Sequence, residues 1–437
     1  MSNYWTHEYL LKTWGGPMVQ AEFIKDLMKP FFVPRVFSGF NLFLDKPQLL
    51  PDAVDLIARE CKSKRAFIVT DEYAVRFAPT VRSPYEKRHG ISFDIWAKAQ
   101  PDAPIDTVKD CAAQIQRFKP DLIFALGGGS AMDTAKGAWL LYEHPDVKLE
   151  ILSPLVPLNL RNKAKLAAIP TTSGTGSEVS GVAVISFPDG VKLPVAGALP
   201  EFVPDFALLD PTFTTGMPPE LTAGTGGDAL THAFDGFMAP KSDEINQAIA
   251  QKTIEMIFKW LPRAYKDGND IMPRMKMQQA AMMAGIPLAN GGSGISHALG
   301  HTIGGLFHIH HGVMVLLFLP YELQVYSKVT DRHLKLCDML GVRDNDSQDA
   351  DSDEKSLANL IEKIRGFMKL LNMPISLKDA GVPLDDLEKN MDMIIEQTPT
   401  DPGFYFGWYD LNKEQFKNIF LSAYEGKLLD MHSDIWT

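Results

Sequence analysis

The residues best suited to chemistry are histidines and one carboxylate between Gly226 and Gly312. Asp228 and His232 lie four positions apart, and so do His297 and His301. In a helix, side chains four residues apart share a face, with Cβ atoms roughly 5 to 6 Å apart. Six of the eleven histidines fall in this stretch, namely His232, His297, His301, His308, His310 and His311. This spacing predicts a divalent-metal site, the alternative being that the histidines cap helices or lie in the core.

Two loops rich in glycine and hydroxyl groups form a second candidate site. The sequence GGGS ends at Ser130, where a predicted strand becomes a helix, so that bare backbone N–H groups and a helix dipole would face an anion. The segment Pro170–Val179, PTTSGTGSEV, offers further hydroxyl groups at a strand end. Together the loops predict a pyrophosphate and ribose site. For each loop the alternative is a tight turn without a ligand.

Asp71 ends the short apolar strand predicted within RAFIVTDEY. Its carboxylate would accept hydrogen bonds from an adenosine ribose and repel a 2′-phosphate, which predicts NAD rather than NADP. The alternative is that Asp71 only caps the next helix. The acid precedes the glycine loop by more than fifty residues, whereas in the usual fingerprint it follows by about twenty. A variant dinucleotide fold is therefore expected.

Size and composition describe an ordinary soluble globular protein with two domains. The chain has 437 residues, of which 45% are hydrophobic and 22% charged, enough for two cores. A net charge of -11 argues against a nucleic-acid or anionic-membrane partner. Cys61, Cys111 and Cys337 lie far apart without a CxxC pair, so we expect neither disulfides nor a thiolate zinc site.

No targeting or membrane segment is predicted. The first residues lack a basic flank followed by an apolar core, and the longest apolar run, Val313–Leu319, is too short for a bilayer. A cytoplasmic location is expected.

The order of elements predicts an α/β domain followed by an all-α domain. After an edge strand at 36–43, apolar strands alternate with amphipathic helices as far as Asp210, which predicts a Rossmann-like parallel sheet covered on both faces in domain 1–211. From Pro211 the pattern is almost entirely helical, which predicts a metal-binding and catalytic helical domain over 212–437. The acidic segment 343–356 predicts a solvated loop.

From about residue 36 to the end, the sequence resembles the iron-containing alcohol dehydrogenases, the family that includes lactaldehyde reductase and 1,3-propanediol dehydrogenase. The resemblance rests on IVTDEYAV, GGGSAMDTAK, PTTSGTGSEV, GMPPELTAGTGGDALTHAFDGF, GISHALGH and HHGVM, in the family's order. It implies an NAD(P)-dependent alcohol dehydrogenase or aldehyde reductase that uses Fe2+. Zn2+ and Mn2+ are the alternatives to Fe2+. Relatives commonly associate, so a homo-oligomer is expected.

The resemblance also assigns residues. The metal ligands it implies are Asp228, His232, His297 and His311. The cofactor contacts it implies are Asp71, Gly128, Gly129, Ser130, Asp133, Thr171, Thr172 and Lys192. His301 would line the active site without binding metal, and we expect it to pass a proton toward solvent; the alternative is that it only orients His297 or a water. His308 and His310 have no family role and are expected at helix ends.

Several positions depart from the family. Asp102, within PDAP, stands where relatives commonly have an amide, which puts an adenine-side contact in question. Val182 replaces a polar amide of the substrate cleft and Leu288 an aromatic residue, while the segment TPTDPGFYFGWYDLN is altered. The predicted cleft is therefore apolar, and the identity of the alcohol is open.

The predicted reaction is hydride transfer between a primary alcohol, or its aldehyde, and nicotinamide, with the metal as Lewis acid. The alternatives are a lyase like dehydroquinate synthase, a polyol oxidoreductase like glycerol dehydrogenase, and a non-catalytic metal-binding protein. A lyase of that kind would hold a polyanionic substrate with clustered basic residues, and the ligand helices carry almost none.

Overall fold

The computed structural model describes residues 33–152, 157–188, 192–196, 199–344, 350–405, 407–408 and 410–436. The aromatic-rich stretch at the N-terminus lies outside these residues, apart from its last few. The chain forms two compact units: the first contains Met1–Met217 and Gly268–Ile286, and the second contains Pro218–Asp267 and Pro287–Thr437. Helix α10 (Ile271–Gly291) therefore contributes its first part to one unit and its last part to the other.

The first unit contains a six-stranded sheet in which every neighbouring pair is parallel. The strand order is β1-β8-β5-β4-β2-β3. The strands are β1 (Arg35–Ser38), β2 (Arg65–Asp71), β3 (Ser92–Ala99), β4 (Leu122–Gly127), β5 (Lys165–Pro170) and β8 (Phe206–Leu209). Strand β1 lies at the edge, as predicted, although it ends at Ser38. The predicted α/β class is confirmed.

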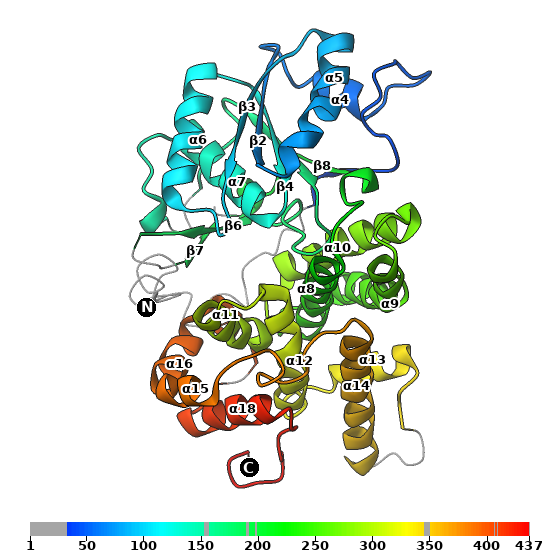
Figure 1. Cartoon of the computed structure of the whole chain (residues 1–437), viewed down its shortest axis with the longest axis vertical. Helices are drawn as coiled ribbons and strands as arrows, with labels where there is room; N and C mark the ends of the chain where they lie inside the picture. Colours follow the sequence, from blue (N-terminus) through cyan, green and yellow to red (C-terminus); the bar gives the residue numbers. More distant parts are fainter. Residues whose placement is uncertain are drawn as a thin grey trace. The chain divides into compact units, whose positions relative to one another are not determined.

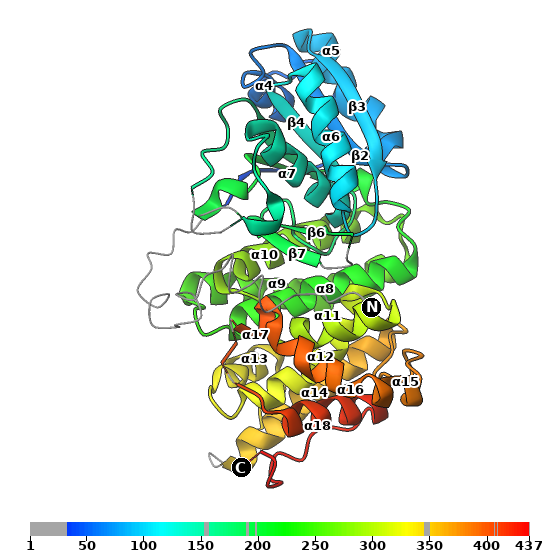
Figure 2. The same cartoon turned by 90° about the vertical axis from the view of Figure 1, so that its left-hand side faces the viewer.

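Alternate side chains of the central strands enter two different cores. Phe67 and Val69 of β2 belong to the core shared with α6 (Ile105–Phe118) and α7 (Gly129–Glu143). Ala66 and Ile68 belong to the core shared with α4 (Ala53–Ala58) and α5 (Ala78–His89). Because successive strand residues point to opposite faces, a sheet covered on both sides needs such continuous apolar strands. Figures 1 and 2 show the two pairs of helices on opposite faces.

A two-stranded antiparallel sheet was not predicted. It pairs β6 (Val182–Ser186) with β7 (Lys192–Ala196), and Ile185 and Val195 are fully buried. Pro194 lies within β7, and proline is depleted from strands, so this segment has a weak strand signal.

The second unit is helical, and among the described residues none after Leu209 belongs to a strand. Its central helix is α8 (Pro219–Met238), buried continuously from Thr222 onward, which fits its small and apolar sequence. Around it pack α9 (Glu244–Lys266) and α12 (His311–Tyr326), and α11 (Ile295–Phe307) packs on α12. The remaining helices are α13 (Arg332–Leu340), α14 (Ala350–Leu370), α15 (Leu384–Lys389), α16 (Met391–Gln397), α17 (Pro402–Tyr405) and α18 (Lys413–Glu425).

The prediction of a loop over 343–356 is wrong in its second half, because α14 begins at Ala350. Leu360, Ile361 and Ile364 are buried on one face of α14, and the polar residues before them extend the same helix. Acidic side chains near a helix N-terminus are stabilised by the helix dipole, which compensates for their low helix propensity.

In the part of the chain that the structure describes, no helix has the length and apolar character needed to span a membrane.

Candidate functional site

Helix α8 presents the first two candidate ligands. Asp228 and His232 lie one turn apart, and His232 Nε2 is 3.3 Å from Asp228 Oδ1. Both residues are buried, with exposed fractions of 3% and 5%. The α8 sequence is rich in glycine and alanine around them, so that neighbouring helices can approach this face closely.

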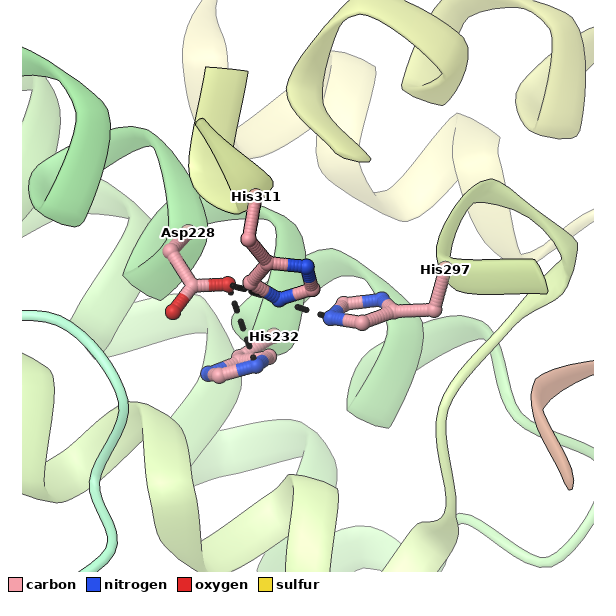
Figure 3. Close-up of side chains that lie close together, drawn as sticks. All are labelled: Asp228, His232, His297 and His311. Atoms are coloured by element: carbon pink, nitrogen blue, oxygen red, sulfur yellow. Dashed lines mark ion pairs between the residues drawn. The ribbon is translucent and has the colours of Figure 1, made fainter. Parts of the chain in front are cut away.

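Helices α11 and α12 supply the other two candidate ligands. His297 lies in the first turn of α11 and His311 is the first residue of α12. Their Nε2 atoms are 3.9 Å and 3.2 Å from Asp228 Oδ1. One ligand atom from each of Asp228, His232, His297 and His311 lies within 4.8 Å of the others, and Figure 3 shows the four side chains pointing toward one another.

The close approach of α12 to α8 depends on a glycine. A Cβ at Gly312 would overlap the carbonyl oxygen of Gly224 and lie 2.8 Å from Asp228 Cβ. Only a residue without a side chain lets the start of α12 touch α8 at this level. His311 is brought beside Asp228 for that reason.

The electrostatics of the cluster suit a cation. Burial lowers the pKa of His232 to about 3 and the pKa of His297 to about 3, so both imidazoles are neutral and offer lone pairs. Burial acts to raise the pKa of Asp228, but the adjacent His232 and His311 outweigh it and hold that pKa well below its ordinary value. His297 Nε2 is buried without a hydrogen-bond partner among the described residues. Three imidazoles and one carboxylate fit iron(II), zinc or manganese.

His301 lies beside this cluster, one turn after His297. Its ring stacks on that of His311 with centroids 4.8 Å apart and an interplanar angle of 17°. Its Nδ1 is 2.7 Å from Oδ2 of Asp401, a carboxylate that is 1% exposed. Asp401 lies in the altered segment TPTDPGFYFGWYDLN, but sequence reasoning did not single it out.

The two remaining histidines lie at helix ends, as expected. His308 is the C-cap of α11 with a left-handed φ of 55°, and His310 precedes α12 as its N-cap residue.

Sequence reasoning also missed a carboxylate next to His297. Asp235 Oδ2 is 2.6 Å from His297 Nδ1. Asp228, His232 and Asp235 are spaced i, i+4 and i+7, so they share one face of α8. That spacing could have shown in the sequence that Asp235 lies near the candidate ligands.

In the first unit, the glycine loop joins β4 to α7. Gly127 has φ 157°, and a Cβ there would lie 2.6 Å from Ala131 Cβ. Gly128 is the N-cap of α7, without a side-chain cap bond, and Gly129 and Ser130 form its first turn. The structure therefore leaves bare N–H groups at the positive end of a fifteen-residue helix.

Asp71 lies next to this loop, on the neighbouring strand. Its Oδ1 accepts hydrogen bonds from the N–H groups of Tyr73 and Ala74 at 2.8 and 2.7 Å, which is the capping alternative. Its Oδ2 faces the loop, 2.9 Å from where a Cβ of Gly127 would be. One carboxylate oxygen thus holds the turn while the other faces the candidate anion site.

The segment 171–180 packs against the same helix. The Thr171 N–H donates to the Gly127 carbonyl at 3.0 Å, and the side chain of Thr172 lies next to Gly128. Asp133 accepts from Ser177 Oγ and from the Val184 N–H, both at 3.2 Å. Burial raises the pKa of Asp133 to about 6. Asp133 therefore connects α7 with the hydroxyl-rich segment and β6.

Lys192 and Asp102 form an ion pair of 2.8 Å. Asp102 has a left-handed φ of 62°, and its N–H donates to Ser130 Oγ at 3.1 Å. Asp102, which departs from the family pattern, is thus hydrogen-bonded to the first turn of α7 and ion-paired with Lys192. Of the two apolar departures, Val182 lies in β6 and Leu288 in α10.

Comparison with known proteins identifies the family. The profile described as "Iron-containing alcohol dehydrogenase" matches residues 49–211, and that described as "Fe-containing alcohol dehydrogenase family, C-terminal" matches residues 222–424. The chain belongs to the iron-containing alcohol dehydrogenase family. The resemblance seen in the sequence is confirmed, and the chain is an oxidoreductase of this family. The alternatives, a lyase or a polyol oxidoreductase on the same fold, are not favoured.

Individual members of the iron-containing alcohol dehydrogenase family align over most of the chain. It is 35% identical to the NADPH-dependent butanol dehydrogenase of Clostridium saccharobutylicum, over 79% of this chain and 87% of that protein. It is 31% identical to the 1-propanol dehydrogenase PduQ of Salmonella typhimurium, over 74% and 84%. The solved alcohol dehydrogenase from Oenococcus oeni matches with a TM-score of 0.79 and 26% identity, covering 91% of this chain and 100% of that chain.

Replacing His297 by alanine is expected to abolish tight metal binding while leaving dinucleotide binding intact, because His297 belongs to the helical unit. We expect metal affinity to fall by more than about 100-fold, since even residues behind a ligand contribute 10- to 100-fold. Elemental analysis and NAD titration would measure the two properties. His432→Ala, at an exposed histidine paired with Glu354, is the control. Parental metal content in His297→Ala would contradict the ligand assignment.

Proposed function

We propose that this chain transfers hydride between a primary alcohol, or its aldehyde, and NAD, using a divalent metal held by Asp228, His232, His297 and His311. The convergence of one carboxylate and three imidazoles carries the proposal. Iron(II) is the proposed ion, in keeping with the family, and zinc and manganese suit the same donors. The named substrates of two relatives, butanol and 1-propanol, support a small primary alcohol.

A divalent ion in this cluster supplies Lewis acidity to the oxygen of the alcohol or carbonyl group. The chain's own contribution begins with neutral imidazoles, which burial secures at His232 and His297. Three neutral imidazoles and one carboxylate would leave a net positive charge on a divalent ion held by them, which is the source of its Lewis acidity.

His301 is the proposed proton acceptor. Asp401 Oδ2, 2.7 Å away, accepts a hydrogen bond from Nδ1–H and so makes Nε2 the basic nitrogen. Asp401 is itself held by the Gly403 N–H, which donates to Oδ1 at 2.7 Å. His301 is a partly exposed side chain, at 23%, so a proton it takes up can pass on to water.

The dinucleotide is proposed to bind along the first turn of α7. The N–H groups of Gly128, Gly129 and Ser130 would receive its pyrophosphate, and Thr171, Thr172, Asp133 and Lys192 complete the proposed contacts. Asp71 would accept hydrogen bonds from the adenosine ribose, and its negative charge favours NAD over NADP. The butanol dehydrogenase relative is named as NADPH-dependent, so cofactor choice varies within the family.

We also propose a cytoplasmic homo-oligomer whose parts are an α/β dinucleotide-binding domain, 1–211, and a helical catalytic domain, 212–437. Cys61, Cys111 and Cys337 are buried without disulfides, which is usual in a reducing compartment. Light scattering of the purified protein would measure the oligomeric state.

The central experiment combines elemental analysis with a panel of alcohols and aldehydes. We expect one bound divalent ion per chain and growth of absorbance at 340 nm with primary alcohol plus NAD, and neither after chelation. Reduction of NAD without a bound metal, or a loaded metal without activity on any alcohol or aldehyde, would contradict the proposal.

Changing Asp71 tests the cofactor assignment. Asp71→Asn removes the charge and keeps an acceptor for the Tyr73 and Ala74 N–H groups, whereas Asp71→Gly removes both. We expect the ratio of kcat/KM for NADP to that for NAD to rise about tenfold in both, since relief of a repulsion of about 1.4 kcal/mol gives that factor. An unchanged ratio in both variants would place Asp71 outside the ribose site.

Changing Asp401 tests the orientation of His301. In Asp401→Asn the amide oxygen can still accept from the Gly403 N–H, but the amide NH2 would then face His301 Nδ1 and favour the opposite tautomer. We expect kcat to fall about 10- to 100-fold, within what general acid–base groups contribute, with metal content unchanged. Asp410→Asn, at an exposed position, is the control. Parental kcat would show that His301 moves no proton in a rate-limiting step.

A further inference from the structure

Behind the candidate ligands lies a group of buried polar side chains that the proposed function does not use. Asp235 of α8, Ser296 of α11 and Glu322 of α12 each have 0% exposure. They come from the same three helices that carry the ligands. Two carboxyl groups in such an interior are costly unless hydrogen bonds compensate for lost water.

Asp235 has donors on both of its oxygens. Oδ2 accepts from the Gly294 N–H and lies 2.6 Å from each of Gly294 N and His297 Nδ1. Oδ1 accepts from Ser296 Oγ at 3.0 Å. Because both oxygens of Asp235 already face N–H and O–H donors, Asp235 is placed to accept a further hydrogen bond from His297 Nδ1–H, which leaves the lone pair of the imidazole on Nε2.

Glu322 has the opposite surroundings. Its Oε2 accepts from the Ser296 N–H at 2.8 Å, but its Oε1 has no N–H or O–H donor among the described residues. Ser296 connects the two acids, because its N–H donates to Glu322 Oε2 and its Oγ donates to Asp235 Oδ1. Burial raises the pKa of Glu322 well above its ordinary value, and the charge of Asp235 raises it further.

We propose that Asp235 is the positioning residue of His297, and that Glu322, connected to Asp235 through Ser296, fixes the start of α11 on which His297 lies. This rests on the proposed metal site. With Nδ1–H bound to Asp235, the lone pair of His297 lies on Nε2, the atom that faces Asp228. A hydrogen-bond acceptor at Nδ1 also makes Nε2 a stronger donor to a cation.

The arrangement also fixes α11 relative to its neighbours. The Gly294 N–H and the Ser296 N–H belong to the start of α11, where backbone N–H groups have no partner within the helix. Asp235 from α8 accepts the first and Glu322 from α12 accepts the second. A Cβ at Gly294 would overlap the Glu322 carboxyl group, so this start is packed directly on that acid. His297 therefore takes its position from both neighbouring helices.

The test uses the full-length protein stripped of metal and titrated with cobalt(II) against a chromophoric chelator. Glu322→Gln keeps an oxygen that can accept from the Ser296 N–H, whereas Glu322→Leu removes that acceptor. Asp235→Asn replaces one accepting oxygen by an NH2 group. Glu354→Gln makes the same chemical change at an exposed carboxylate of α14 and is the matched control.

We expect Glu322→Gln and Glu354→Gln to bind cobalt(II) within about threefold of the parent, and Asp235→Asn and Glu322→Leu to bind it about 10- to 100-fold more weakly. The d–d absorption bands of bound cobalt should shift in Asp235→Asn and stay unchanged in Glu322→Gln, because only Asp235 contacts a proposed ligand, His297. Circular dichroism would verify folding, and the Glu322→Gln comparison remains decisive if Glu322→Leu does not fold.

Three results would overturn the inference. The first is parental cobalt(II) affinity with an unshifted spectrum in Asp235→Asn. The second is a loss of cobalt(II) affinity in Glu322→Gln as large as in Asp235→Asn. The third is full cobalt(II) affinity in a folded Glu322→Leu. His297→Ala separates this outcome from failure of the proposed metal site. If His297→Ala keeps cobalt, the site itself is wrong; if it loses cobalt while Asp235→Asn does not, only the positioning role fails.

Discussion

The site depends on the close contact of three helices inside one unit. Four donor atoms lie within 4.8 Å of one another, yet they belong to α8, α11 and α12, so a shift of any helix by about 1 Å would separate them. Small residues permit the contact. Gly312 lies against Gly224, and a Cβ at Gly300 would lie 2.8 Å from a methyl group of Val315. With so little free volume, the positions of the donor atoms are set by how the helices pack and not by the conformations of individual side chains.

In the first unit, a parallel sheet brings the residues of the candidate dinucleotide site together. Parallel strands end at one edge, so Asp71 at the end of β2 comes next to Gly127 at the end of β4. Helix α7 is then held by Lys136, whose ammonium group donates to Ser177 Oγ, Ser180 Oγ and the carbonyls of Ser180 and Val182. Burial lowers the pKa of Lys136 to about 8, and the nearby carboxylates of Asp133 and Glu178 oppose that change. The hydroxyl-rich segment thereby keeps a fixed distance from the glycine loop.

Much of this was visible in the sequence because its causes are local. Apolar strands ending in glycine predicted the sheet and the loop, and spacings of four predicted Asp228 with His232 on one helix face. Glu322 and Asp401 were not found, because their contacts with Ser296 and with His301 join distant segments. Asp235 was missed although it shares a face of α8 with Asp228 and His232. Glu322 lies within an apolar helix, where periodicity gives no sign of a hydrogen-bonded acid. The β6–β7 pair and the start of α14 were missed because tertiary packing overrides weak local preferences there.

Charge balance explains why several carboxyl groups can lie close to the proposed ligands. Asp228 would balance part of the charge of a divalent ion, and Asp235 lies directly behind His297. Hydrogen bonds from the Gly294 N–H, the Ser296 N–H and Ser296 Oγ compensate Asp235 and Glu322 for the water that burial removes. The same balance accounts for the absence of lysine and arginine from α8, α11 and α12, since a fixed cation there would compete with the metal for Asp228.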